Sequence, residues 1–166
     1  MPGFEKRRIG RTSVEVTALG LGCATLGGSR IAVSRQEAEA IVGAAWAAGV
    51  CYIDTAPYYG VGQAERCVGD AMRWVPRDEW VLSTKVGRLL RPRRTTAEDN
   101  ERRHPLPFDP VYDYSYDGVM RSFEDSLQRL AIGARRAERG QLERGVDQTF
   151  RHRPRLPMRE GVGVIE

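Results

Sequence analysis

The stretch that decides the fold runs from Val50 to Glu65 and reads VCYIDTAPYYGVGQAE. A short apolar run at 50–53 ends at Asp54, and a glycine-containing loop then leads into a segment whose apolar residues recur at helical spacing. This order predicts a buried strand followed by a helix. Because parallel strands need a covering connection of this kind, the stretch indicates one βα unit of a parallel sheet.

The segments before this unit predict a hairpin, a strand and a helix. Two short runs around 10–13 indicate a β-hairpin, and the apolar, glycine-rich stretch 16–28 indicates a buried strand that runs into a loop. A capping box from Ser34 to Glu37 begins a helix, and Gly49 ends it. The apolar face expected for this helix comprises Ala38, Ile41, Val42, Ala45 and Ala48.

The segments after the unit continue the alternation. The second helix has a predicted buried stripe of Ala64, Cys67, Val68, Ala71 and Met72. Pro76 breaks this helix, and the apolar run 80–84 predicts a third strand ending at Lys85. Residues 90–115, rich in Arg, Pro, Asp and Tyr, predict a long loop with some local pairing, and 116–130 predicts another helix.

The fold class that follows is α/β: a partial (β/α)8 TIM barrel with an N-terminal β-hairpin and about three βα units. A complete barrel takes ~250 residues, more than this chain offers. We expect two parts, 1–130 and an Arg-rich tail at 131–166. The tail is expected to be irregular and to supply no fourth strand, because it has no long apolar run.

Three side chains could carry chemistry at the carboxyl ends of these strands: Asp54, Tyr59 and Lys85. A free tyrosine has a pKa of about 10, and a nearby ammonium lowers that value by stabilising the phenolate. A carboxylate beside the ammonium keeps it in place and charged. Such a tyrosine can protonate a carbonyl oxygen while a cofactor delivers hydride. On spacing alone, Lys85 could instead be an ordinary solvated lysine, Asp54 a turn cap, and Tyr59 a packing residue.

Several motifs together resemble the aldo-keto reductase family. YIDTAPYYGVGQAE at 52–65 resembles its signature, and STKVG at 83–87 resembles its catalytic-lysine strand. The similarity covers 4–130 and is closest to the branch of aldose, fucose and pyridoxal dehydrogenases. It implies a TIM barrel and an NAD- or NADP-dependent oxidoreductase acting on aldehydes, ketones or aldoses. By this resemblance Asp54 orients, Tyr59 is the general acid/base and Lys85 tunes it.

The resemblance also shows what is not found. The family places a histidine at the end of its fourth strand, but neither His104 nor His152 follows an apolar strand. Most of the family's cofactor-binding positions are not found either, so no cofactor-binding residues are assigned. We therefore expect an N-terminal part of the family's barrel with little or no activity by itself. The glycine pairs at 20–22 and 60–62 do not complete a G-x-G-x-x-G fingerprint, which argues against a Rossmann domain.

Composition and charge bear on whether the protein binds nucleic acid or metal, spans a membrane or is secreted. The net charge is +4, and the tail supplies three of these charges with eight arginines and five acidic residues, which does not favour a nucleic-acid partner. No stretch approaches the ~20 apolar residues of a membrane span, no signal peptide is evident, and three cysteines without metal spacing indicate reduced thiols. We expect a cytoplasmic protein with a small carbonyl or sugar substrate and no metal; the oligomeric state stays open.

Two interpretations of the tail also stay open. It could be a basic arm, which would make the chain a non-catalytic remnant or an interaction module that binds acidic partners. Alternatively, the chain departs from its family after Leu130 through a frameshift, a deletion or a mispredicted gene, which we favour.

Overall fold

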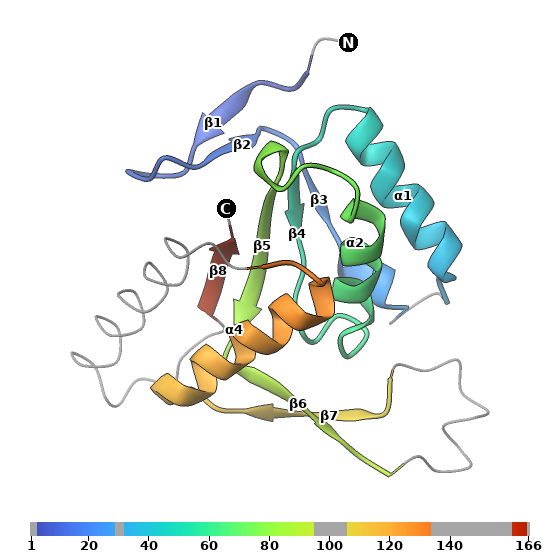
Figure 1. Ribbon diagram of the computed structural model, residues 1–166, viewed down its shortest axis with the longest axis vertical. Helices are drawn as coiled ribbons and strands as arrows, with labels where there is room; N and C mark the ends of the chain where they lie inside the picture. Colours follow the sequence, from blue (N-terminus) through green and yellow to red (C-terminus); the bar gives the residue numbers. More distant parts are fainter. Residues whose placement is uncertain (1–2, 29–31, 95–105, 134–160, 166) are drawn as a thin grey trace.

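The computed structural model describes residues 3–28, 32–94 and 106–133, together with the backbone of 161–165 (Figure 1). Its elements, in chain order, are β1 (Lys6–Arg8), β2 (Glu15–Thr17), β3 (Gly20–Gly22), the 3-10 helix η1 (Ala24–Gly27), α1 (Arg35–Ala47), β4 (Tyr52–Asp54), α2 (Gln63–Met72), the 3-10 helix η2 (Arg77–Glu79), β5 (Val81–Val86), β6 (Arg88–Pro92), β7 (Phe108–Tyr112), α4 (Tyr116–Leu130) and β8 (Gly161–Ile165). The order alternates strands with helices from β3 to β5, as the sequence predicts.

The central sheet has the strand order β3-β4-β5-β8, and its first three strands are parallel. Leu21, Ile53 and Leu82 alternate with the residues of the site along these strands and pack toward the helices. Because successive side chains of a strand point to opposite faces, Asp54 and Lys85 lie on the other face. The sheet therefore separates an apolar layer from the face that carries the candidate chemistry.

Helix α1 begins at the capping box that the sequence predicts. The Ser34 hydroxyl accepts from the Glu37 amide at 3.2 Å, and the Glu37 carboxylate accepts from the Ser34 amide at 2.8 Å. Two positions of its predicted apolar face, Ile41 and Ala48, are exposed, so that part of the prediction is wrong. Each residue turns the helix by about 100°, and the buried stripe is centred on Ala38 and Val42, which leaves Ile41 on its flank.

Helices α2 and α4 cover the same face of the sheet as α1 (Figure 1). They approach each other closely at Gly69, where a Cβ would overlap the backbone of Leu130. The apolar spacing of 116–130 predicts that Val119, Phe123, Leu127 and Leu130 share one face; Val119, Phe123 and Leu130 are buried in the core, and Leu127 is partly buried against it. A glycine at this crossing lets the last turn of α4 reach the middle of α2.

Two pairs of strands lie outside the parallel sheet. β1 and β2 form the predicted N-terminal hairpin. β6 and β7 pair antiparallel, with Arg88 opposite Tyr112, so the ends of the predicted long loop form a hairpin and the local pairing is present. Residues 95–105, which connect its arms, lie outside the described residues, as does 134–160 of the tail.

One strand was not expected from the sequence. β8 lies beside β5 but runs antiparallel to it, from Gly161 opposite Val86 to Ile165 opposite Leu82. It does not continue the parallel alternation that the βα units set up. Its position means that β5 has hydrogen-bonded neighbours on both of its edges. No helix in the described part of the chain is long and apolar enough to cross a bilayer.

Candidate active site

The three predicted residues come from two neighbouring strands and the turn after one of them. Asp54 is the last residue of β4, Tyr59 lies in the following turn, and Lys85 is near the end of β5. Asp54 is opposite Ser83 in the strand register, so Lys85 lies two residues further along on the same face. The carboxyl ends of parallel strands meet at one edge, and the structure accordingly brings all three side chains together.

The ammonium of Lys85 is the centre of this group. Its Nζ lies 3.1 Å from Asp54 Oδ2 and donates to the carbonyl oxygen of Thr55 at 3.1 Å. It also lies 4.7 Å from the centroid of the Tyr59 ring. The Lys85 side chain is 17 % exposed and that of Asp54 is 32 % exposed. The pair is thus partly shielded from water, on the side of the sheet opposite to α1, α2 and α4.

The pKa of Lys85 is raised above its ordinary value. Burial by itself would lower this pKa, but hydrogen bonding to Tyr59 and Asp54, together with their charges, outweighs the loss of solvation. A raised folded-state pKa adds to the free energy of unfolding below the pKa of the unfolded chain, and this contribution is lost as the pH rises through the folded-state pKa. The neutral range lies well below both pKa values, so Lys85 is a cation beside Tyr59 there.

Two further polar residues that the sequence reasoning missed adjoin this group. Ser83 donates to Asp54 Oδ1 at 2.6 Å, and the Tyr52 hydroxyl lies 3.0 Å from Ser83 Oγ. Tyr52 precedes Asp54 by two residues, and Ser83 precedes Lys85 by two. The period-two alternation of a strand was the signal that could have identified both.

Cys23 lies close to the site but is not a second reactive group. Its backbone amide donates to the carbonyl oxygen of Asp54 at 2.8 Å. Burial, and secondly the charge of Asp54, raise the pKa of the Cys23 thiol to about 12. At neutral pH this cysteine is a neutral core residue, because the nucleophilic form of cysteine is the thiolate.

The turn that carries Tyr59 is held by a contact between two stretches of backbone. Gly60 has a φ of +62°, and a Cβ at this position would overlap the carbonyl group of Gly27 in η1. The Tyr59 amide donates to the Ala56 carbonyl at 3.1 Å, and the Tyr59 carbonyl accepts from the Ala64 amide at 3.1 Å. These bonds tie Tyr59 to the end of β4 on one side and to the start of α2 on the other.

The comparisons with known proteins identify the family. The model of the aldo/keto reductase family matches residues 18–134. The chain belongs to the aldo/keto reductase family. The predicted fold class is confirmed with it, since solved members of the family share this fold and the three βα units are part of its TIM barrel.

Two curated relatives are similar over most of the chain. Pyridoxal 4-dehydrogenase of Microbacterium luteolum is 49 % identical over 138 residues, which cover 77 % of this chain and 40 % of that protein. D-threo-aldose 1-dehydrogenase of a Pseudomonas species is 42 % identical over 122 residues, which cover 70 % of this chain and 37 % of that protein. The chain thus spans about two-fifths of the length of these relatives.

Solved structures agree on the fold. An aldo-keto reductase of Pseudomonas aeruginosa matches with a TM-score of 0.58 and 31 % identity, over 78 % of this chain and 44 % of that one. An aldo-keto reductase of Bacillus halodurans matches with a TM-score of 0.63 over 89 % of this chain and 46 % of that one. Its identity is 24 %, so this second likeness concerns the fold alone.

In this aldo/keto reductase chain an arginine joins the site loop to the β6–β7 hairpin. The guanidinium of Arg88 lies 4.2 Å from the ring centroid of Tyr58 and 4.6 Å from that of Tyr112. Tyr58 is 51 % exposed, and it neighbours Tyr59 in sequence. Stacking of a cation on aromatic rings stabilises such a contact. The hairpin is therefore anchored beside the turn that carries Tyr59.

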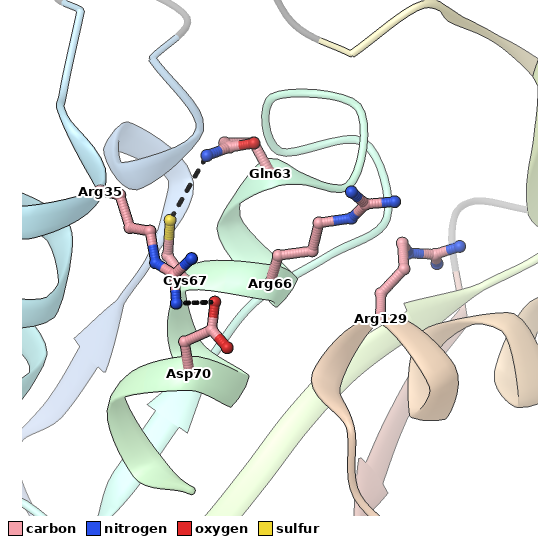
Figure 2. Close-up of a pocket in the computed structure, with 6 residues that line it drawn as sticks. All are labelled: Arg35, Gln63, Arg66, Cys67, Asp70 and Arg129. Carbon is pink, nitrogen blue, oxygen red and sulfur yellow. Dashed lines mark hydrogen bonds and ion pairs between the residues drawn. The ribbon is translucent and has the colours of Figure 1, made fainter.

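A polar pocket lies on the opposite, helix-covered side of the aldo/keto reductase sheet (Figure 2). It has a volume of about 270 Å³, and its lining residues are Arg35, Gln63, Arg66, Cys67, Asp70 and Arg129. Arg35 pairs with Asp70 at 3.0 Å, and Arg129 pairs with the buried Glu65 at 2.5 Å. Because α1, α2 and α4 supply its whole lining, this pocket is separate from the Asp54–Lys85 group.

Among the residues that the structure describes, no cluster of three or more His, Cys, Asp or Glu could hold a metal ion. His104 and His152 lie outside the described residues. Gly22 is opposite Asp54 in the register, and a Cβ placed on it would have no atom within 4 Å. The space beside Asp54 on this face of the sheet is thus open in the described part of the chain.

Replacing Gly60 with alanine is expected to destabilise the protein by about 1–3 kcal/mol, because the new Cβ meets Gly27 and the left-handed backbone is strained. Urea denaturation of the purified chain measures this. Gly43→Ala is the matched control, since Gly43 is exposed in α1 with nothing within 4 Å of its Cβ position. That control should stabilise by ~0.5–1 kcal/mol. Equal effects of the two substitutions would contradict the backbone contact as the cause.

Proposed function

We propose that this chain carries the proton-transfer group of an NAD- or NADP-dependent oxidoreductase that acts on aldehydes, ketones or aldoses. The observation that supports it most is the position of the Lys85 ammonium, which lies between the carboxylate of Asp54 and the ring of Tyr59. A cation in this place stabilises the phenolate that would remain after Tyr59 gives its proton to a substrate.

The role of each residue follows from its contacts. In the direction of reduction, the Tyr59 hydroxyl gives its proton to the substrate's carbonyl oxygen, and in oxidation it takes the proton back. Lys85 stabilises the phenolate that remains after the proton has left. Asp54 holds the ammonium at 3.1 Å and keeps it charged. The nicotinamide cofactor, when bound, supplies or accepts the hydride, since no side chain does so.

The substrate class is proposed from the relatives and from the rim of the site. The two relatives described above are named for oxidation of pyridoxal and of D-threo-aldoses. Beside Tyr59, the exposed ring of Tyr58 stacks on Arg88 and offers both a flat apolar face and a cation. These groups suit a small polar aldehyde or a cyclic sugar.

The three buried free thiols support a reducing compartment, the cytoplasm.

The test is an assay with pyridoxal and with aldoses, in which formation of NADH or NADPH is followed by absorbance. One arm uses the purified 166-residue chain. A second arm places residues 18–134 into the Microbacterium luteolum enzyme in place of its matching segment, because the chain spans about two-fifths of that protein. Turnover that requires Tyr59 in either arm supports the proposal. No turnover above the Tyr59→Phe background in both arms would overturn it.

A further inference from the structure

A directional chain of hydrogen bonds leads to Asp54 from the interior of the sheet. Ser83 Oγ lies 2.6 Å from Asp54 Oδ1, and Tyr52 Oη lies 3.0 Å from Ser83 Oγ. An ionised carboxylate can only accept, and a serine hydroxyl has one proton to donate. The proton of Ser83 therefore points to Asp54, and the hydroxyl of Tyr52 donates to Ser83.

These hydrogen bonds from Tyr52 and Ser83 decide which oxygen of Asp54 is available to Lys85. Ser83 engages Oδ1, and the closer contact of Lys85 is with Oδ2, at 3.1 Å against 3.5 Å for Oδ1. The terminal torsion of an aspartate is soft, so a carboxylate without such a bond rotates easily. The ammonium has a second fixed acceptor in the Thr55 carbonyl, which leaves its remaining proton for the side of Tyr59.

The two residues behind Asp54 are themselves held in place. Ser83 is fully buried in β5. Tyr52 lies opposite Gly20 in the strand register, and a Cβ on Gly20 would come within 2.6 Å of the Tyr52 ring. The absence of a side chain at Gly20 leaves room for this ring beside β3. The hydroxyl of Tyr52 meets Ser83 of β5.

We propose that Ser83 and Tyr52 are positioning residues, which fix the Asp54 carboxylate and through it the ammonium of Lys85 beside Tyr59. This inference deepens the proposed function and rests on it, because the placement of Lys85 matters for turnover only if Tyr59 transfers the proton. Neither residue touches a reacting atom in this arrangement. Their effect is expected in the ionisation of Lys85 and in the turnover number, more than in substrate affinity.

The chain offers a direct measurement, because Lys6 and Lys85 are its only two lysines. Isotope-labelled lysine gives one NMR signal for each, and the exposed Lys6 serves as an internal reference during a pH titration. The charged or titratable groups that act on Lys85 are Asp54, Tyr59 and Cys23. Ser83→Ala leaves all three in place and should lower the pKa of Lys85 by about half a unit or more.

Tyr52→Phe should shift the same signal in the same direction by a smaller amount. It keeps the ring over Gly20 and removes only the hydroxyl, so it carries the test if Ser83→Ala does not fold. Ser122→Ala is the matched control, since Ser122 is also fully buried but donates to the Arg88 carbonyl at 3.2 Å. This control should cost a similar stability and leave Lys85 unchanged.

Two outcomes would overturn the inference: an unchanged Lys85 pKa in both Ser83→Ala and Tyr52→Phe, or an equal shift in Ser122→Ala. The proposed function fails separately from this inference. A shifted Lys85 in a protein without oxidoreductase turnover would leave the positioning of Asp54 standing and reject the activity. Turnover with an unshifted Lys85 would do the reverse.

Discussion

Replacing Glu65 with alanine is expected to lower the free energy of unfolding by about 3–5 kcal/mol, the cost of leaving the other partner of a buried ion pair uncompensated. Glu65 is 0 % exposed in α2, and its carboxylate accepts from Arg129 Nε at 2.5 Å and from Thr84 Oγ1 at 2.8 Å. Arg129 is 13 % exposed and also donates to Ser126. Without Glu65, a largely buried guanidinium loses its charged partner between α2, α4 and β5.

Urea denaturation with a constant slope measures this loss. The matched control is Glu39→Ala, which removes the exposed pair of Glu39 and Arg35 in α1 and should cost about 0.5 kcal/mol or less. A double replacement, Glu65→Leu with Arg129→Met, should recover much of the stability, because apolar residues of similar size remove both charges. A loss from Glu65→Ala no larger than that of the control would show that the pair is not structural.

Replacing Tyr59 with phenylalanine is expected to lower kcat/KM by about a hundred- to ten-thousand-fold, the usual contribution of a general acid. The substitution keeps the ring near the Lys85 ammonium and removes only the hydroxyl that transfers the proton. Stability should change by less than about 1 kcal/mol, because the side chain is only half-buried. The measurement is the rate of NADH or NADPH formation in the arm of the assay that turns over.

Tyr58→Phe is the matched control for this prediction. It removes the hydroxyl of the adjacent tyrosine, whose exposed ring stacks on Arg88, and it should change kcat/KM by no more than a few-fold. A larger loss from Tyr58→Phe than from Tyr59→Phe would show that Tyr58, and not Tyr59, transfers the proton. Binding of the reduced cofactor is measured by fluorescence in both variants. Unchanged binding shows that a lower kcat/KM comes from the proton-transfer step and not from weaker cofactor binding.

Local signals in the sequence were sufficient for most of the fold. The capping box at Ser34 and the apolar spacing of 116–130 locate α1 and α4 because both depend on residues within a few positions of each other. The exposure of Ile41 could not be predicted in this way. Its side chain is apolar like those beside it, and only the packing of α1 against α2 and the sheet decides which flank of the helix is covered.

The two buried or partly buried ion pairs, one in the candidate site and one between α2 and α4, differ in the same way. Asp54 and Lys85 could be expected to meet because parallel neighbouring strands end at one edge. The ion pair of Glu65 and Arg129 joins residues 64 positions apart, and no local pattern links them. The sequence nevertheless held one signal for this ion pair. Glu65 lies three residues before Val68 and seven before Met72, which places it within the buried stripe of α2. An acidic residue in such a stripe indicates a distant basic partner.

The meeting of Gly27 with Gly60 has a consequence for how this protein could be altered. Main chain presses on main chain there, so the course of the turn depends little on which side chains the turn displays. An engineer could exchange Tyr58 for a smaller or more polar residue and expect the neighbouring phenol to stay where it is. The position of Tyr59 and the side chain displayed at the adjacent position 58 can thus be varied independently of each other.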